Sequence, residues 1–505
     1  MDERTLLDAV GDHARRPSPA ILAGPQRVSY PELMLLVEGT ARRLREKGVR
    51  PADRVLVVLP NGIEHVVAVL AVMTVDAIAV PLDVGSGATR VAAAVDQAAP
   101  TLALVDPHGA PPEGVPAAHL RLDASVGAEL HDFGDRDRPA APDSVPVVPE
   151  TAAALIRFTS GSTGLPKGVV LGHRQVIATA RLLSSVYGLD EDHRELILVS
   201  IAHSDGWQRV AATLVGGGTV AFSEGLPTVG GILDDVESLE ATGFFVPPPL
   251  LRVLLQSVSG RARRVLARCR SIEIGSAVVT PEELRLLMAW APAARVFVHY
   301  GLTECSRAVI LDARRHAEKL ATVGTPAAGV ELKLVSSDGR PASAGQICLR
   351  GPQRAEGYWN RPELNAERFV DGWFTTGDEG VVDAQGFLTL RGRRDDMITS
   401  GGHHFFPAEV EVELGAVDSV AQYLIAGVPD PRGVLQEVPW AFVVPRDRAG
   451  FSPRGFLLEA RRRLPPHMVP RHVVSVASLP LTPSGKPDRR RAVAMYAPVR
   501  KAGDG

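Results

Sequence analysis

A segment rich in glycine, hydroxyl groups and one lysine lies at residues 158–168, with the sequence FTSGSTGLPKG. It contains three glycines, four serine or threonine residues and Lys167, and it comes shortly after the apolar run AAALI. Glycine lets backbone N–H groups turn toward a ligand, and the hydroxyl groups and the ammonium group add further donors. Such donors suit the oxygens of a polyanion, so the segment predicts a phosphate-binding loop.

Two common nucleotide-binding patterns do not fit this segment. For the Walker A pattern, counting from Gly161 places Pro166 at the second glycine and Gly168 at the hydroxyl that would bind magnesium. The dinucleotide pattern G-x-G-x-x-G is also missing between a strand and a helix. A flexible linker is the structural alternative, but linkers seldom place ordered hydroxyl groups before a fixed lysine.

The segment resembles the phosphate loop of the adenylate-forming superfamily, which includes acyl- and aryl-CoA ligases and peptide-synthetase adenylation domains. Further motifs follow in that family's order and cover nearly the whole chain: YGLTE at 300–304, FTTGD at 374–378, GRRDD at 392–396 and PLTPSGKPDRR at 480–490. The resemblance implies an ATP- and carboxylate-binding domain over residues 1–394 and a mobile C-terminal domain over residues 395–505.

Catalytic roles follow from this resemblance. In the family the tyrosine of the second motif packs on adenine, the threonine binds the α-phosphate and the glutamate helps to hold Mg²⁺, which implies these roles for Tyr300, Thr303 and Glu304. An aromatic face, a hydroxyl and a carboxylate also suit a base, a phosphate and a hard cation, although the motif alone would equally fit a strand end. Lys486 matches the family's mobile lysine, a cation that stabilises charge as a carboxylate attacks the α-phosphorus.

The resemblance also implies a set of nucleotide-binding residues. ATP would contact Thr159, Ser160, Gly161, Ser162, Thr163, Gly164, Lys167, Gly275, Ser276, Ala277, Tyr300, Gly301, Asp378 and Arg393. Glu304 and Thr163 would hold magnesium. Asp378 would accept hydrogen bonds from the ribose hydroxyls, although an aspartate after glycine is also common in hairpin turns. Ser276 and Val278 depart from the Gly-Gly-Ala-Pro segment of relatives, which alters the shape of the pocket.

The segment SIAHSDGWQR at 200–209 is expected to line the carboxylate pocket. It is closer to the Pro-x-x-His-x-x-Gly motif of acyl- and aryl-CoA ligases than to the Phe-Asp motif of peptide-synthetase domains. Substrate contacts are predicted for His203, Ser204, Trp207, Gly275 and Gly301. Because the segment is polar, it favours a small or aromatic acid with a polar substituent over a long alkyl chain.

The acceptor of the activated acyl group is predicted from DDMITSGG at 395–402, which resembles the CoA-ligase version of this motif. In that version the glycine pair lets the backbone approach the pantetheine arm, and Asp395 would be the hinge. CoA is therefore the expected second substrate, with an acyl carrier protein or another nucleophile such as an amine as the alternative. A non-enzymatic nucleotide-binding relative would be expected to lack Glu304, Asp378 or Lys486, and all three are present.

The elements that must position these residues follow an α/β pattern. Residues 29–49 begin with Ser29 and have Glu32 three residues later, which predicts a capped helix. RVLVVLP at 54–60 and the apolar window at 65–83 predict buried strands and a buried helix. Turns at Asp338 and Gln385 predict hairpins of a small barrel-like unit. The last hundred or so residues show a helix, two strands and a second helix, which predicts a compact α+β domain.

Composition excludes several other classes of protein. A net charge of -3 gives no basic field for nucleic acid, and Asp76 and Pro81 interrupt the most apolar window before it could span a membrane. Three widely spaced cysteines argue against a disulfide scaffold and fit a reducing compartment. The sequence predicts a cytoplasmic enzyme acting on small molecules.

Overall fold

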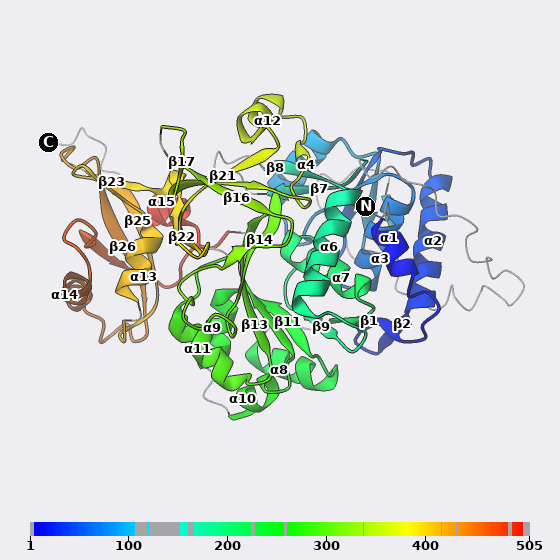
Figure 1. Ribbon diagram of the computed structural model, residues 1–505, viewed down its shortest axis with the longest axis horizontal. Coiled ribbons are helices and arrows are strands. Elements are labelled where there is room, and N and C mark those ends of the chain that lie inside the picture. Colours follow the sequence, from blue (N-terminus) through cyan, green and yellow to red (C-terminus); the bar gives the residue numbers. More distant parts are fainter. Residues whose placement is uncertain are drawn as a thin grey trace, which may run out of the picture. The chain divides into compact units, whose positions relative to one another are not determined.

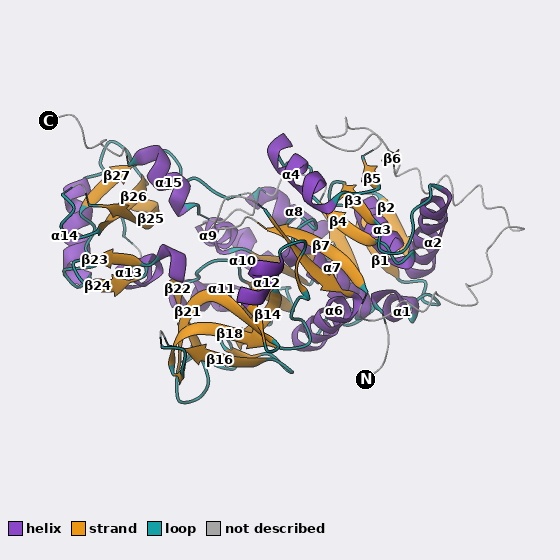
Figure 2. Cartoon of the chain, turned by 90° about the horizontal axis from the view of Figure 1, so that it is seen from above, coloured by secondary structure: helices purple, strands orange, loops and turns teal. Residues whose placement is uncertain are grey.

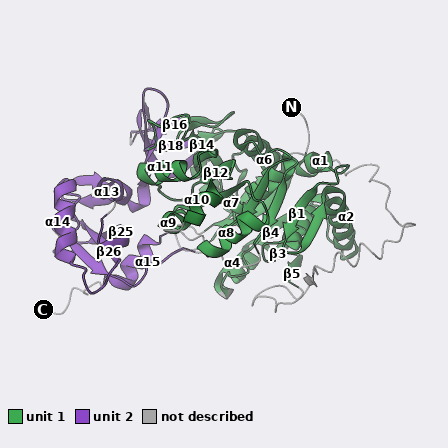
Figure 3. Ribbon diagram, turned by 90° about the horizontal axis from the view of Figure 1, so that it is seen from below, with its two compact units in different colours: residues 1–320, 324–332, 349–374 green, residues 321–323, 333–348, 375–505 purple. Residues whose placement is uncertain are grey.

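The computed structural model describes residues 5–106, 119–121, 152–159, 166–223, 228–256, 260–336, 338–415, 417–430, 432–482 and 487–497. Residues 160–164 of the predicted phosphate loop, and Lys486, lie outside the described residues. The chain divides into two compact units (Figure 3). The first contains Met1–Leu320, Gly324–Leu332 and Leu349–Phe374; the second contains Ala321–Val323, Lys333–Cys348 and Thr375–Gly505. The domain boundary after residue 394 stays a prediction.

The first unit has two large sheets (Figure 1). The nine-stranded sheet has the order β15 (Thr325–Pro326), β14 (Cys305–Asp312), β13 (Arg295–Leu302), β12 (Ser271–Ile274), β11 (Gly243–Val246), β9 (Arg194–Ile197), β10 (Thr219–Phe222), β1 (Pro19–Ala23), β2 (Gln26–Ser29). The seven-stranded sheet has the order β19 (Gly357–Tyr358), β8 (Lys167–Gly172), β7 (Ala153–Thr159), β4 (Ile78–Pro81), β3 (Arg54–Val58), β5 (Leu102–Val105), β6 (His119–Arg121).

Helices cover these sheets, as predicted. They are α1 (Leu6–Gly11), α2 (Tyr30–Glu46), α3 (Ile63–Thr74), α4 (Ala88–Ala98), α6 (His173–Tyr187), α7 (Ser204–Val215), α8 (Val229–Ser238), α9 (Pro248–Gln256), α10 (Gly260–Leu266), α11 (Pro281–Trp290) and α12 (Pro362–Arg368). The start of α2 is the predicted capping box, since the Ser29 hydroxyl accepts from the Glu32 N–H and the Glu32 carboxylate accepts from the Ser29 N–H.

One apolar core joins the two sheets through the helices between them. It contains side chains of β1 and β10 from one sheet, of β3, β4, β7 and β8 from the other, and of α1, α2, α3, α6 and α7. In β3, Val55 and Val57 face this core, while Leu56 and Val58 face a second cluster with α4. Burial on both faces explains the continuous apolar run that predicted this strand.

The second unit contains the predicted hairpins and α+β block (Figure 2). A sheet assigned mainly to it has the order β17 (Pro341–Ala342), β16 (Glu331–Val335), β18 (Ala344–Arg350), β21 (Trp373–Val382), β20 (Phe369–Val370), with β22 (Leu388–Arg393) on β21. Two smaller sheets are β23 (Ile398–Ser400) with β24 (His403–Phe405), and β25 (Val420–Pro429), β26 (Glu437–Pro445), β27 (His472–Ser475). Its helices are α13 (Pro407–Leu414), α14 (Pro453–Arg463) and α15 (Arg489–Tyr496). No described helix is long and apolar enough to cross a membrane.

Candidate active site

Strand topology brings the ends of distant segments to one region of the first unit. Strands β9, β11, β12 and β13 are parallel, so their carboxyl ends lie at the same edge of the nine-stranded sheet. Ligands of open α/β sheets bind at this edge. The motif residues Gly275, Gly301 and Thr303 follow or end these strands. In the other sheet Thr159 and Lys167 are paired across β7 and β8, at the two ends of the predicted phosphate loop.

Tyr358 links two of the predicted site residues. Its hydroxyl donates a hydrogen bond of 2.7 Å to the buried Glu304 carboxylate, and the Lys167 Nζ lies 5.7 Å from its ring centroid. Asn365 fixes the tyrosine backbone, accepting from its N–H (2.6 Å) and donating to its carbonyl oxygen (2.9 Å). A cation and a carboxylate far apart in sequence are thus brought to one aromatic ring. No sequence motif marked Tyr358, so sequence reasoning missed it.

A second contact joins the predicted substrate segment to the YGLTE motif. The Ser204 hydroxyl donates to Thr303 Oγ1 at 3.2 Å. Ser204 is the first residue of α7, after the half-buried N-cap residue His203. Burial and then the charge of Arg90 lower the pKa of His203. The structure therefore brings Ser204 and Thr303 together, and their roles as substrate and phosphate contacts stay predictions.

Two glycines of the predicted site allow close packing. A Cβ atom on Gly275 would lie 2.1 Å from Cε1 of His299, and one on Gly301 would lie 2.4 Å from the backbone nitrogen of Arg307. Tyr300, which directly precedes Gly301 in the chain, is also buried. Ser276 has a φ of 73°, in the left-handed region that favours glycine. The close contacts explain why the chain needs glycine at positions 275 and 301.

A network of ionisable side chains lies beside this site, and all of its members except Asp205 are buried. We call it the buried ionic network, and its members are His193, Glu195, Asp205, Arg209, Glu273, His299 and Arg307. Arg209 Nε donates to Glu195 Oε1 at 2.7 Å, and His193 Nε2 lies 2.8 Å from Glu195 Oε2. Arg209 Nη1 lies 3.4 Å from Glu273 Oε2, which extends the network from Glu195 on β9 to Glu273 on β12.

Glu273 is the centre of this network. Its Oε1 accepts from the Tyr187 hydroxyl at 2.7 Å and lies 2.7 Å from His299 Nδ1 and 3.1 Å from Arg307 Nε. Burial alone would raise the pKa of Glu273, but the neighbouring Arg307 and His299 outweigh burial and hold that pKa well below its usual range. Glu273 is therefore ionised, and removing it would leave buried cations without their counter-charge.

Asp205 is the outer member of the network. Its Oδ2 accepts from the Ser276 hydroxyl at 2.5 Å, and its Oδ1 lies 3.1 Å from Arg307 Nη1 and 3.9 Å from His299 Nε2. Arg307 has a φ of 46°, a strained conformation for a non-glycine residue, which surrounding ion pairs can hold in place. Sequence reasoning noted Asp205 and Arg209 only as polar residues and did not identify Glu273, His299 or Arg307.

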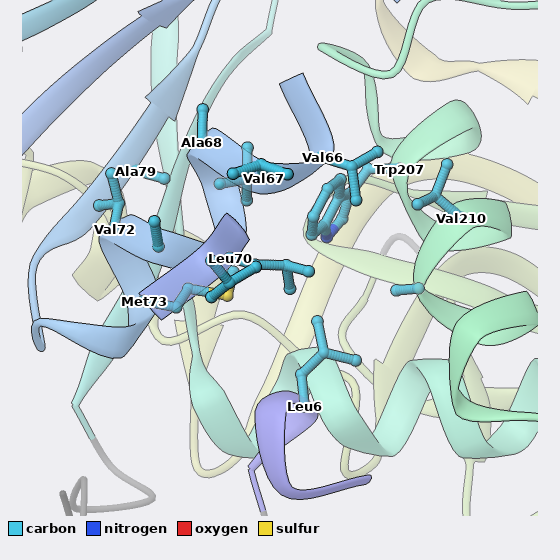
Figure 4. Close-up of a cluster of buried hydrophobic side chains, with 14 of the residues drawn as sticks. Leu6, Val66, Val67, Ala68, Leu70, Val72, Met73, Ala79, Trp207 and Val210 are labelled. Carbon is cyan, nitrogen blue, oxygen red and sulfur yellow. The ribbon is translucent and has the colours of Figure 1, made fainter. Parts of the chain in front are cut away.

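Trp207, a predicted substrate contact, lies in the apolar core. It packs among residues such as Val66 and Leu70 and is almost fully buried (Figure 4). On α7, Ser204 and Asp205 face the site described above, whereas Trp207 faces α3. Trp207 also lines a small cavity with Arg157 and Thr303, and its role as a substrate contact stays a prediction.

Two predicted ribose-binding residues lie in the second unit. Asp378 and Arg393 are paired across β21 and β22, with 3.6 Å between Asp378 Oδ1 and Arg393 Nε. The predicted hinge Asp395 lies directly after them, in the short 3₁₀ turn Arg394–Asp396. Gly401 and Gly402 both have positive φ and form the turn between β23 and β24.

The residues of the first unit fit a nucleotide with magnesium. Among the described residues no group of three histidine, cysteine or carboxylate side chains could hold a metal ion. Magnesium bound to a nucleotide needs only one or two protein carboxylates, because phosphate oxygens and water complete its coordination. Glu304, buried and oriented by Tyr358, suits this role. The donor set around Lys167 and Thr303 suits the phosphates.

Comparison with known proteins defines the family. The model of the AMP-binding enzyme family matches residues 10–359, and the model of the AMP-binding enzyme C-terminal domain matches residues 409–486. These matches cover most of the chain, which therefore belongs to the AMP-binding enzyme family. The predicted adenylate-forming ligase is confirmed at this level.

Individual relatives are similar over nearly their whole length. Feruloyl-CoA synthase of an Amycolatopsis species is 33% identical over 92% of this chain and 94% of its own. Fatty acid–[acyl-carrier-protein] ligase ScoC of Streptomyces coeruleorubidus is 31% identical over 96% of this chain and 95% of its own. The structure of o-succinylbenzoate-CoA synthetase of Bacillus subtilis in complex with ATP and magnesium ion is 26% identical, with a TM-score of 0.81 over 96% of this chain and 98% of that one. This likeness confirms the predicted fold class.

Proposed function

We propose that the protein activates a carboxylic acid with ATP and transfers the acyl group to CoA. A carboxylate oxygen attacks the α-phosphorus, the bond to the β-phosphate oxygen breaks, and acyl-AMP and pyrophosphate form. The thiol of CoA then attacks the acyl carbon, and AMP leaves with the carboxylate oxygen. The observation that carries this proposal is the meeting of Lys167 and Glu304 at Tyr358, because a polyphosphate needs a cation and a metal-binding carboxylate in one place.

The chain's own residues have separate roles in this proposal. Lys167 and the loop before it would bind the terminal phosphates, and Thr303 would donate to the α-phosphate. Tyr300 would pack on the adenine, while Asp378 and Arg393 would bind the ribose. Glu304 and Thr163 would hold magnesium, which when bound neutralises phosphate charge and polarises the reacting phosphorus.

The substrate and the acceptor are inferred from polarity and from relatives. Ser204, Asp205, Ser276 and His299 would give the acid site a polar wall, which supports a small or aromatic acid with a polar substituent. A relative named for feruloyl-CoA supports CoA as the acceptor, and a relative named for an acyl carrier protein supports the alternative. The cytoplasm, where ATP and CoA are available, is the proposed location.

The C-terminal domain is proposed to act in both half-reactions. Lys486 would stabilise charge on the phosphates only during adenylation, and Asp395 would be the pivot between two orientations of the domain. Lys486→Ala should therefore slow adenylation roughly 100-fold but spare transfer from a supplied acyl-adenylate. Asp395→Pro should show the opposite pattern, because proline restricts φ at the pivot. Equal loss of both steps in either variant would contradict these roles.

A screen for acid-dependent pyrophosphate release tests the proposed function. Purified protein is incubated with ATP, Mg²⁺ and a broad panel of carboxylic acids, first alone and then with CoA or an acyl carrier protein. We expect release with at least one acid, and formation of the thioester when CoA is added. The absence of acid-dependent release across the panel would contradict the proposal.

A further inference from the structure

Asp205 is the part of the buried ionic network that a ligand can reach. Its side chain is 30% exposed, whereas those of Glu273, His299 and Arg307 are exposed by 0–4%. Asp205 lies in the first turn of α7, directly after the residue that contacts Thr303. The network therefore presents a carboxylate, and not one of its buried cations, toward the site.

Two contacts hold this carboxylate in one orientation. The Ser276 hydroxyl donates to Oδ2 at 2.5 Å, and Arg307 Nη1 lies 3.1 Å from Oδ1. Arg307 is itself fixed by Glu273 at 3.1 Å and by the Gln208 side-chain oxygen. A carboxylate held this way is a preorganised hydrogen-bond acceptor, and charged acceptors form the stronger hydrogen bonds.

The guanidinium group in direct contact with Asp205, that of Arg307, is occupied by the protein. All three nitrogens of Arg307 have partners: Nε contacts Glu273, Nη1 contacts Asp205 and Gln208, and Nη2 contacts the Asp205 carbonyl oxygen at 3.3 Å. Arg157, another buried guanidinium, donates from Nη1 to the Ala202 carbonyl oxygen at 2.6 Å, while its Nη2 is buried without a hydrogen-bond partner among the described residues. Asp205 itself is in direct contact with Ser276 and Arg307, so the immediate surroundings of this carboxylate suit a hydrogen-bond donor better than a second carboxylate.

The position of Asp205 limits the length of the ligand. Ser204 contacts Thr303, beside which the proposed function places the reacting carboxylate and α-phosphate. Asp205 directly follows Ser204 in α7, and successive Cα atoms are about 3.8 Å apart, so the two residues are close neighbours. We therefore place the group that would reach Asp205 near the carboxyl end of the acid, about two to four bonds from its carboxyl carbon.

We propose that the acid carries a hydrogen-bond donor, a hydroxyl or amino group, two to four bonds from its carboxyl carbon, and that Asp205 recognises this donor. The inference rests on the proposed function and specifies the polar substituent of its substrate. Ser276 is a positioning residue, because it orients the carboxylate of Asp205.

Two matched series of acids test this proposal without any mutation. One is butanoate with an amino, hydroxyl, methoxy, methyl or carboxylate group on carbon 3, and the other is benzoate with the same groups on carbon 2. In at least one series we expect the amino or hydroxyl acid to exceed the methyl, methoxy and carboxylate acids about 30-fold in kcat/KM for pyrophosphate release. The amino and hydroxyl arms identify which donor is preferred.

Variants then assign the preference to Asp205. Asp205→Asn should reduce the ratio of the donor acid to the methyl acid about 30-fold, and Ser276→Ala about 5-fold. Asp234→Asn, a surface carboxylate paired with Arg261, is the matched control and should leave the ratio unchanged. If Asp205→Asn fails to fold, Ser276→Ala gives the same test, since it keeps the charge of the network.

Several outcomes would overturn the inference. They are equal use of methyl and donor acids, preference for the dicarboxylate, no activity with either series, or an unchanged ratio in folded Asp205→Asn. If other acids in the broad panel still release pyrophosphate, only this inference has failed. If no acid in the panel does, the proposed function has failed instead.

Discussion

Two polar regions of the first unit are constructed in opposite ways. In the nucleotide region, comprising Lys167, Thr303, Glu304 and Tyr358, the Glu304 carboxylate accepts a 2.7 Å hydrogen bond from a neutral group, the Tyr358 hydroxyl. The buried ionic network, by contrast, joins each member to at least one partner within about 4 Å and is closed to water except at Asp205. The contact of Glu304 is thus with a neutral hydroxyl, whereas the carboxylates of the network contact arginine side chains.

This comparison predicts that the two regions fail differently when mutated. A change in the nucleotide region should remove activity and leave the fold, because the ligand is the missing partner. A change within the buried ionic network should remove stability first, because it leaves a buried charge without its counter-ion.

The largest expected effect is on activity in the nucleotide region. Glu304→Ala removes the proposed magnesium ligand and should lower kcat/KM for pyrophosphate release roughly 10³-fold, or about 4 kcal/mol. The Tyr358 hydroxyl loses its acceptor, so the free energy of unfolding should fall by no more than about 2 kcal/mol. Activity near that of the wild type in a folded variant would exclude a role for Glu304.

The next effect is on stability in the buried ionic network. Glu273→Gln should lower the free energy of unfolding by about 3 kcal/mol, because Arg307, Arg209 and His299 lose their shared carboxylate. Glu282→Gln, an exposed carboxylate that pairs with Arg285, is the matched control and should change stability by less than about 0.5 kcal/mol. Similar denaturation midpoints for both variants would show that the network carries no such stability.

A smaller effect should appear as a dependence of stability on pH. Burial lowers the pKa of His65 to about 4, and its Nε2 is buried without a hydrogen-bond partner among the described residues. Because the unfolded state binds the proton first, stability is complete above about pH 6.5 and is lost as the pH falls toward about 4. Between pH 6.5 and 5 the wild type should lose about 2 kcal/mol more than His65→Gln. Parallel denaturation profiles of the two proteins would refute this.

The smallest expected effect concerns Tyr358, whose side chain contacts both Lys167 and Glu304. Tyr358→Phe removes the hydroxyl that orients Glu304 and should lower stability by about 1 kcal/mol and kcat/KM about 5-fold. Tyr423→Phe is a matched control, since that hydroxyl donates to the carbonyl oxygens of Glu411 and Gly415 in the second unit. It should cost similar stability and leave pyrophosphate release unchanged. Identical kinetics of the two variants would show that Tyr358 is only structural.

Local signals were sufficient for much of the fold. The serine and glutamate that cap α2, the apolar runs of β3 and β4, and the hairpin between β21 and β22 depend on neighbouring residues, and the sequence predicted them. Lys167, Thr303 and Glu304 could be singled out because they lie in contiguous motifs, and their roles stay predictions. Tyr358 was missed because its partner Glu304 is 54 residues away in the sequence.

The buried ionic network could not be predicted from local pattern. A glutamate such as Glu273, in a short strand, would normally be assigned to a solvent-facing position of that strand. Its burial depends on Arg209, His299 and Arg307, which come from three other elements. Trp207 is the opposite case. It belongs to the segment that was predicted to contact the substrate, but its side chain lies on the core face of α7. Only the tertiary structure reveals these pairings.

The central claim is that a carboxylate of the substrate attacks the α-phosphorus of ATP. An acid identified by the screen, labelled with ¹⁸O in both carboxyl oxygens, tests this claim when it is incubated with the wild-type protein, ATP, Mg²⁺ and CoA. Mass spectrometry should show AMP that contains one ¹⁸O atom, because AMP leaves with the attacking oxygen of the acid. Unlabelled AMP, or ADP as the nucleotide product, would contradict the account.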